Sequence, residues 1–323
     1  MCTAITYQGK SHYFGRNLDF EHDFGECVVI TPRNYSLVFR RENEISQHYA
    51  IIGMAVVDND YPLYFDGTNE KGLSMAGLYF PDNAVYLPEK EGCFNVTAFE
   101  FIPWILSQCA NTKEALEKLA CVNLVDLPYS EQYPLTPLHW IITDKNKAIT
   151  VEPTIDGLKI YDNPIGVLTN NPPFPYHLYH LKNYLNLTRE EPTNRFAPQC
   201  NIQAYSRGMG AIGLPGDLSS SSRFIRAAFT KLNSVCDDTE ESGVTQFFHI
   251  LTSVEQQRGC VKVGNGFEKT IYSCCCNTDS GTYYYTTYDN PQITAICLRN
   301  TDMDSAKLSV FPLIKHQNIH YEN

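Results

Sequence analysis

The chain lacks any long apolar segment, and no stretch approaches the roughly 18–20 residues that a membrane-spanning helix requires. Its start lacks the basic and then apolar pattern of a secretory signal, so we expect a cytoplasmic protein. Lys and Arg total 25 against 36 Asp and Glu, and no block of like charges occurs, which argues against nucleic acid and membrane surfaces as partners. Linkers rich in Pro, Gly or Ser are also missing, so residues 1–323 are expected to form one domain.

The twelve cysteines include no C-x-x-C pair and no Cys/His grouping with zinc spacing. They are scattered through a chain that is too long to need disulfides and is expected to be reduced. The run Cys274–Cys276 falls in a predicted strand, where neighbours alternate faces, so we expect these thiols to fill core and surface positions. The sequence therefore predicts no disulfide framework, no metal and no cofactor.

Strand and helix patterns are grouped rather than alternating. The absence of a βαβ rhythm predicts an α+β fold in which antiparallel sheets are covered by helices. We expect helices at 98–109, 112–120 (with Thr112 as N-cap), 222–232 and 244–253, and strands at 3–7, 11–14, 27–32, 37–40, 49–57, 138–143, 148–152, 158–161, 270–276, 282–288 and 293–298.

Cys2 is the first candidate for catalysis, because a small residue after the initiator Met allows that Met to be removed. Cys2 would then carry both a thiol, with an ordinary pKa of about 8.5, and an α-amine, with an ordinary pKa of about 7.7–8.0. An N-terminal amine is a recognised activator of such a nucleophile. On the dipeptide alone, the alternative is a chemically idle cysteine.

Arg16 and Asp19 are expected to lie near Cys2. A tight turn at Gln8-Gly9-Lys10 folds the second strand back beside the first, and these two residues follow that strand. A cation there would favour a thiolate, and a carboxylate would hold the amine. The alternative is a surface ion pair of little energetic value.

Six segments carry a resemblance that spans nearly the whole chain. They are MCTAITYQGKSHYFGRNLDFE (1–21), NEKGLSMAGLYFP (69–81), PLHW (137–140), GVLTNNP (166–172), YSRGMGAIGLPGDLSSSSRF (205–224) and YYYTTYDNPQITA (283–295). In this order they resemble the choloylglycine hydrolase family, which contains conjugated bile salt hydrolases and penicillin V acylases. The resemblance implies an N-terminal nucleophile hydrolase with an αββα sandwich, in which two antiparallel sheets are covered by helices.

The resemblance also implies further catalytic residues. It assigns one oxyanion donor to the side chain of Asn170, with Asn171 as a competing choice, and matches Arg223 to an active-site arginine. From the residues alone, Asn170 could instead lie in a β-turn and Arg223 could be a solvated charge at a helix start. Ser219–Ser222 are expected to be helix N-caps, and His139 a structural histidine.

The second oxyanion donor maps to Tyr79, where bile salt hydrolases usually carry Asn and the Tyr is similar to penicillin V acylases. Its backbone N–H could still donate, although Tyr79 could also simply pack in the core beside Phe80. The acyl group is expected to meet two loop regions, 58–65 and 126–137, that mix aromatic and aliphatic residues with prolines. The candidate substrate-binding residues are Leu18, Tyr61, Phe65, Leu127, Tyr129, Tyr133 and Leu135.

Two classes of function remain at this stage: an amidase acting on a linear amide with a bulky apolar acyl group, and a non-catalytic protein of the same fold. The set of candidate residues favours the enzyme. Within it, hydrolysis of glycine- or taurine-conjugated bile acids is favoured over penicillin V acylase activity, although Tyr79 argues for the latter. The segment 185–216 resembles an insertion with which bile salt hydrolases of gut Gram-positive bacteria form tetramers, so a homotetramer is expected.

Overall fold

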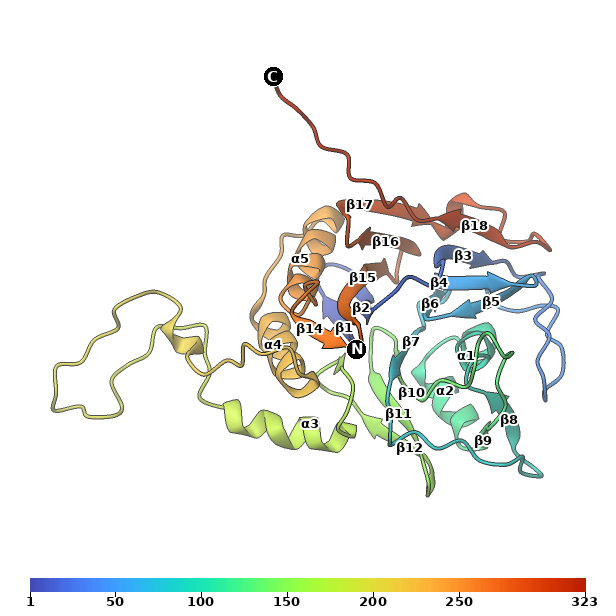
Figure 1. Cartoon of the computed structure of the whole chain (residues 1–323), viewed down its shortest axis with the longest axis horizontal. Coiled ribbons are helices and arrows are strands. Elements are labelled where there is room, and N and C mark those ends of the chain that lie inside the picture. The colour runs from blue at the N-terminus through green and yellow to red at the C-terminus, as the bar shows by residue number, and fades with distance from the viewer.

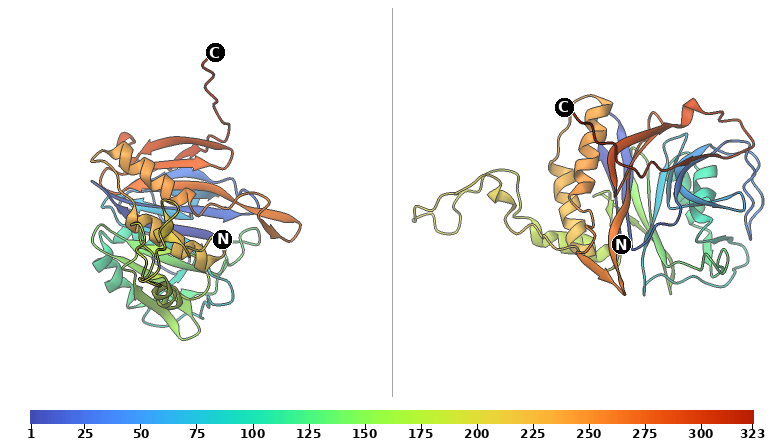
Figure 2. Two further views of the ribbon diagram at one scale, coloured as in Figure 1. Left: turned by 90° about the vertical axis from the view of Figure 1, so that its left-hand side faces the viewer. Right: turned by 45° about the horizontal axis from the view of Figure 1, so that its top comes forward.

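Two antiparallel sheets pack face to face in the computed structural model, which describes residues 1–323, and helices cover their outer faces (Figures 1 and 2). This arrangement confirms the predicted αββα sandwich. The helices are α1 (Phe101–Gln108), α2 (Thr112–Leu119), α3 (Phe174–Leu181), α4 (Ser220–Asn233) and α5 (Glu240–Thr252), with short 3-10 helices at Lys182–Tyr184, Met209–Ala211 and Leu298–Asn300.

The first sheet has seven strands and contains Cys2, Arg16 and Asp19. Its strands are β1 (Cys2–Gln8), β2 (His12–Phe20), β13 (Val167–Leu168), β14 (Val261–Val263), β15 (Gly266–Asn277), β16 (Thr282–Thr287) and β17 (Asn290–Cys297). They run in the order β13-β1-β2-β15-β16-β17, and β14 pairs with β15. Helices α4 and α5 pack on this sheet and share its hydrophobic core.

The second sheet has nine strands, and α1 and α2 pack on its outer face. Its order is β12-β11-β10-β7-β6-β4-β3-β18, and β5 pairs with β4. The strands are β3 (Cys27–Thr31), β4 (Ile51–Asp58), β5 (Tyr61–Tyr64), β6 (Asp66–Asn69), β7 (Ser74–Tyr79), β10 (Leu138–Thr143), β11 (Ala148–Thr154), β12 (Gly157–Asp162) and β18 (Ser309–Pro312), and a separate parallel pair consists of β8 (Phe94–Thr97) and β9 (Val122–Val125).

The β1–β2 hairpin places the N-terminal cysteine. Cys2 lies opposite Leu18, and Ala4 lies opposite Arg16, so the side chains of these residues share one face of the sheet. The second strand continues beyond its predicted end, to Phe20. A Cβ at Gly15 would lie 1.9 Å from the carbonyl oxygen of Cys274, so this close approach of β2 and β15 requires glycine.

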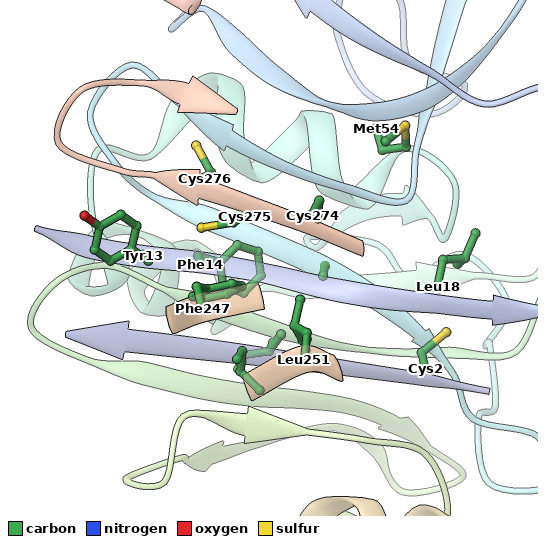
Figure 3. Packing of buried hydrophobic residues seen from close by; sticks show 14 of the residues in the cluster. Cys2, Tyr13, Phe14, Leu18, Met54, Phe247, Leu251, Cys274, Cys275 and Cys276 are labelled. Carbon is green, nitrogen blue, oxygen red and sulfur yellow. The ribbon is translucent and has the colours of Figure 1, made fainter. Parts of the chain in front are cut away.

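Residues 270–277 of the central strand β15 are buried on both faces, because one face meets the second sheet and the other meets α5 (Figure 3). Cys274, Cys275 and Cys276 are all buried as a result, and the expectation that part of this run reaches the surface is wrong. Neighbouring side chains still alternate between the two faces of the strand, but both faces are covered by other parts of the protein.

Two local predictions are also wrong, and one helix was missed. Residues 37–40 form no strand and contribute only the isolated bridge between Leu37 and Ile45. The N-cap of α2 is Asn111, whose side chain accepts the N–H of Glu114, whereas Thr112 is the first helical residue. Helix α3 was not predicted, because its aromatic and histidine-rich sequence gives no clear helical period.

The segment 185–216 projects from the body beyond α3 and α4 and contains only one short 3-10 helix (Figures 1 and 2). It exposes large apolar side chains, and Phe196 has 95% of its surface accessible. None of the helices combines the length and the apolar character needed to cross a bilayer.

Candidate active site

Cys2 begins β1 and is held through its main chain. Its side chain is buried, with 4% exposed, on the face that looks toward the second sheet. Its N–H donates to Asn170 Oδ1 at 2.8 Å, and its carbonyl oxygen accepts from Arg223 Nη1 at 2.5 Å. These two contacts fix the backbone on either side of the thiol-bearing carbon.

The side chain of Asn170 has one orientation that satisfies all its contacts. Its Oδ1 accepts from Cys2 N–H and from Arg223 Nη2, both at 2.8 Å, while its Nδ2 donates to the carbonyl of Tyr79 at 2.7 Å. The second N–H of this amide donates no hydrogen bond to the protein. The competing residue Asn171 donates to the carbonyl of Pro81 instead and does not contact Cys2.

Arg223 lies in the first turn of α4 and is fully buried, so the alternative of a solvated helix-start charge is wrong. It donates to four oxygens, those of Cys2, Thr3, Leu218 and Asn170. Burial lowers the pKa of this guanidinium, while Asp19 and Cys2 act in the opposite direction. As predicted, Ser219 caps the helix by accepting the N–H of Ser222.

Asp19 lies on the helix-facing side of the sheet. Its Oδ1 accepts from Thr270 Oγ1 at 2.7 Å, and its Oδ2 has no hydrogen-bond donor but lies 4.0 Å from Arg223 Nη1. Burial raises the pKa of this carboxyl, against the lowering influence of Arg223 and of the N-terminal ammonium. In the chain with Met1 in place, the ammonium contacts the main-chain carbonyl of Asp19 at 2.8 Å rather than its carboxylate.

Arg16 lies on the opposite face of the sheet, the same face as Cys2. Its Nη1 donates to the carbonyls of Gly77 at 2.5 Å and Phe65 at 3.1 Å, and its Nη2 has no partner. Burial acts to lower the pKa of this guanidinium, but the influence of Cys2, Tyr272 and Asp66 raises it overall. Arg16 and Asp19 are therefore both buried and do not pair with each other, which excludes the surface ion pair.

Tyr79 ends β7, and its carbonyl accepts the side chain of Asn170. Its own side chain is 40% exposed, so it does not pack in the core beside Phe80. Phe80 instead stacks on His139, with ring centroids 4.2 Å apart. His139 is the expected structural histidine, because it is buried and contacts Glu152 Oε1 and the carbonyl of Thr169.

The predicted substrate-binding residues divide into groups. Leu18 and Phe65 pack with the core cluster that contains Cys2, and Phe65 is joined by Phe24, with centroids 5.5 Å apart. Tyr129 contacts both Tyr61 and Tyr133 in a separate aromatic group, and Leu135 packs on the second core cluster. Leu127 is half-buried after β9. The structure thus places only Leu18 and Phe65 in the same core cluster as the cysteine.

Two cavities of the structure lie away from Cys2. One of about 580 Å³ is lined by Thr6, Tyr7 and Lys231, toward the other end of β1, and the other, of about 720 Å³, is lined by Arg33, His48 and Glu70. None of the predicted catalytic residues lines either cavity.

Several residues at this site were missed by the sequence reasoning. Thr3 accepts from Arg223, Thr270 donates to Asp19, and Glu268 forms an ion pair with the Met1 ammonium. Glu268 and Thr270 are both buried and two positions apart on β15. Because strand residues alternate faces, the sequence could have predicted that Glu268 and Thr270 share a face and that Lys269 lies on the other. Nothing in the local sequence indicates that the shared face belongs to a site.

Cys2 lies next to the chain start, and its side chain faces the second sheet. A side-chain amide and a buried guanidinium hold its main chain. Together these features define an N-terminal nucleophile hydrolase. The sequence model of the choloylglycine hydrolase family of linear amide C–N hydrolases matches residues 2–311, and this chain belongs to that family. The predicted class of enzyme is thereby confirmed.

Relatives and solved structures agree with this assignment. The chain is 52% identical over 314 residues to a bile salt hydrolase/transferase of Lactiplantibacillus plantarum, with 97% of each chain covered, and 38% identical to one of Clostridium perfringens over the whole of both. Among solved structures, the C2A mutant of the conjugated bile acid hydrolase from Clostridium perfringens matches all of both chains with a TM-score of 0.92 and 36% identity. A penicillin V acylase from Agrobacterium tumefaciens, at 17% identity and a TM-score of 0.75 over 96% of this chain and 91% of that one, shares the fold.

Proposed function

We propose that this chain hydrolyses the amide bond of glycine- or taurine-conjugated bile acids, with Cys2 as the nucleophile after removal of Met1. The observation that carries the proposal is the network in which Asn170 and Arg223 together hold the main chain of Cys2 on both sides of its thiol. The full-length similarity to proteins named as bile salt hydrolases supports the choice of substrate.

The proposed reaction begins when Cys2 Sγ attacks the amide carbonyl and its proton passes to the α-amine of the same residue. The tetrahedral oxyanion accepts hydrogen bonds from the free N–H of Asn170 Nδ2 and from the backbone N–H of Tyr79. The α-amine then returns the proton to the leaving nitrogen, which departs as the C–N bond breaks. Water hydrolyses the resulting thioester at Cys2.

The charged residues have separate roles in this proposal. Arg16 shares the face of the Cys2 thiol and has a buried, unpartnered Nη2, so its charge favours the thiolate. Arg223 positions the Cys2 main chain and Asn170, and Asp19 balances its charge from 4.0 Å. Leu18, opposite Cys2, and Phe65 are the predicted residues best placed to contact the acyl group.

Substitution of the nucleophile tests the mechanism. Cys2→Ala should abolish release of cholate from glycocholate while leaving the melting temperature near that of the parent protein, because no other residue at the site can attack the carbonyl. Cys2→Ser should lose several orders of magnitude in kcat, since a hydroxyl is the poorer nucleophile at neutral pH. Intact mass should show the loss of Met1, and iodoacetamide should label Cys2 once. Amidase activity above a few per cent in Cys2→Ala would contradict the mechanism.

Penicillin V acylase activity is the second candidate, and Tyr79 is the observation that favours it. Its main-chain carbonyl accepts from Asn170, and its side chain is exposed, so it is free to contact an acyl group at this end of β7. Comparing kcat/KM for glycocholate, taurocholate and penicillin V decides between the candidates. A larger value for penicillin V would overturn the bile acid proposal and leave the nucleophile assignment intact.

We also propose that the chain acts as a homotetramer in the cytoplasm. The projecting segment 185–216 supports assembly, because it exposes the large apolar side chains of Leu185, Phe196 and Tyr205 to solvent. The twelve free cysteines suit a reducing compartment. Light scattering at micromolar concentration should give about four times the mass of one chain, and a monomer would dismiss the tetramer.

A further inference from the structure

Two buried histidines hold the short segment that carries Asn170 into the site. His139 Nε2 lies 2.9 Å from the carbonyl oxygen of Thr169, and His177 Nε2 lies 3.0 Å from the carbonyl oxygen of Asn170. Ser220, the first residue of α4, accepts the N–H of Asn170 at 2.8 Å. The peptide groups on both sides of Asn170 are therefore held by side chains from other elements.

The partners of His139 determine where its hydrogens lie. The carbonyl oxygen of Thr169 can only accept, so Nε2 of the ring must carry a hydrogen. On the other side of the ring, Nδ1 lies 3.1 Å from Oε1 of Glu152, which is also fully buried. Two lone pairs that face each other in a buried site would repel, so one proton lies between Nδ1 and Oε1. Whichever of these atoms carries that proton, Nε2 remains a donor.

Glu152 can maintain this arrangement only as a carboxyl group. Its Oε1 also accepts the N–H of Phe174, the first residue of α3, at 2.9 Å. A glutamine oxygen there would still accept from Phe174, but a neutral imidazole would then need its only hydrogen on Nδ1. Nε2 would turn a lone pair toward the carbonyl of Thr169. A glutamine nitrogen at the same position would instead oppose the N–H of Phe174.

His139 also contacts the strand that carries Tyr79, the other proposed oxyanion donor. It lies in β10, which pairs with β7, and its ring stacks on Phe80 with centroids 4.2 Å apart and an interplanar angle of 5°. Phe80 directly follows Tyr79, just as Thr169 directly precedes Asn170. One side chain thus contacts the residue next to each donor.

We propose that His139 is a positioning residue that sets the distance between the oxyanion donors Asn170 and Tyr79. Glu152 contributes by keeping the hydrogen on Nε2. The inference rests on the proposed function, because it assumes that both donors meet one tetrahedral intermediate. Such donors act at about 2.7–3.1 Å from the oxyanion, and a misplacement of about 1 Å can cost 10²-fold in rate.

The test compares two replacements of His139 that keep different ends of the imidazole. The amide nitrogen of glutamine reaches about as far from the backbone as Nε2, whereas that of asparagine reaches only about as far as Nδ1. His139→Asn should lower kcat on glycocholate by about 10–10²-fold with little change in KM. His139→Gln should recover most of this loss, because it restores a donor to Thr169. A merely structural role would lower the melting temperature of both variants without separating their kcat values.

A double variant shows whether His139 acts through Asn170. In an Asn170→Asp background one donor is already missing, so the distance between donors no longer matters, and His139→Asn should change kcat by less than threefold. His12→Asn is the matched control, because His12 is also buried and its ring contacts Thr278 Oγ1 rather than a residue of the site. Its kcat should stay within threefold of the parent value.

Glu152→Gln is a second variant that leaves the imidazole in place, so the test does not depend on the folding of His139→Asn. It should show the same loss of kcat, and that loss should disappear in the Asn170→Asp background. Equal kcat values for His139→Asn and His139→Gln, additive losses in the double variant, or a kcat of Glu152→Gln within threefold of the parent would each overturn the proposal. Absence of cholate release by the parent enzyme would instead overturn the proposed function.

Discussion

Replacing Asn170 by Asp separates two tasks of one side chain. Aspartate keeps the oxygen that accepts from Cys2 and Arg223 but loses the Nδ2 that donates to Tyr79 and whose second N–H is free for an oxyanion. Loss of one oxyanion donor typically lowers kcat by about 10²–10³-fold. We therefore expect Asn170→Asp to lose that much in kcat on glycocholate while KM changes far less.

The stability of two variants provides the comparison. Asn170→Ala removes two neutral hydrogen bonds, each worth about 1 kcal/mol, and one to a buried guanidinium, worth about 1.5–3 kcal/mol. The sum is about 4 kcal/mol. With an unfolding entropy of about 2.1 cal/mol/K per residue, this loss lowers the melting temperature of a chain of 323 residues by about 6 °C. Asn170→Asp loses one neutral bond and gains a charge beside Arg223, so its melting temperature should fall by less than half as much.

The assays are steady-state hydrolysis of glycocholate and thermal unfolding followed by circular dichroism. Alkylation of Cys2 by iodoacetamide serves as a control, because Asn170→Asp should still present a reactive thiol. A kcat within threefold of the parent value in Asn170→Asp would show that the side-chain nitrogen is not an oxyanion donor. In that case the role of Asn170 would be confined to positioning the Cys2 main chain and Arg223.

Two further predictions concern Tyr79 and His12. Tyr79→Phe should keep most of the activity, because the proposed donor is its backbone N–H, and a collapse of kcat for every substrate would show that the hydroxyl takes part. Burial lowers the pKa of His12 to about 4, so between pH 4 and its ordinary 6.5 the unfolded chain binds a proton that the folded chain does not. Stability should therefore rise with pH across this window, by up to about 3 kcal/mol from this group. In His12→Gln, urea unfolding should show a smaller rise, and an unchanged pH dependence would contradict the assignment to His12.

The antiparallel grouping and the first hairpin could be predicted from the sequence because local signals specify them. Alternating strand residues and the turn at Gly9 are enough to bring residues 16–19 back to Cys2. Helix α3 and the burial of Cys274–Cys276 could not be predicted in this way, because they depend on what packs against each segment. A strand that is covered on both faces has no polar side for a periodicity argument to detect.

The candidate site shows the same division. Cys2 was marked by its position, and Asn170 and Arg223 by the resemblance to a known family. Glu268 carried no mark, because buried carboxylates are rare and a sequence pattern assigns a charged strand residue to solvent. Its role depends on a pairing with a residue 267 positions away, which only the assembled sheet brings together.

The pairing of Met1 with β2 also constrains biosynthesis. In the folded chain its ammonium is mostly buried and its main chain exchanges two hydrogen bonds with Asp19, so an aminopeptidase has little access to the first peptide bond. Excision must then compete in time with closure of the sheet, while the chain is still emerging from the ribosome. Molecules that fold first are locked with an acylated Cys2 nitrogen, which cannot accept a proton. Rapid overproduction should therefore yield preparations in which active-site titration finds fewer sites than chains, with the shortfall equal to the fraction that retains Met1.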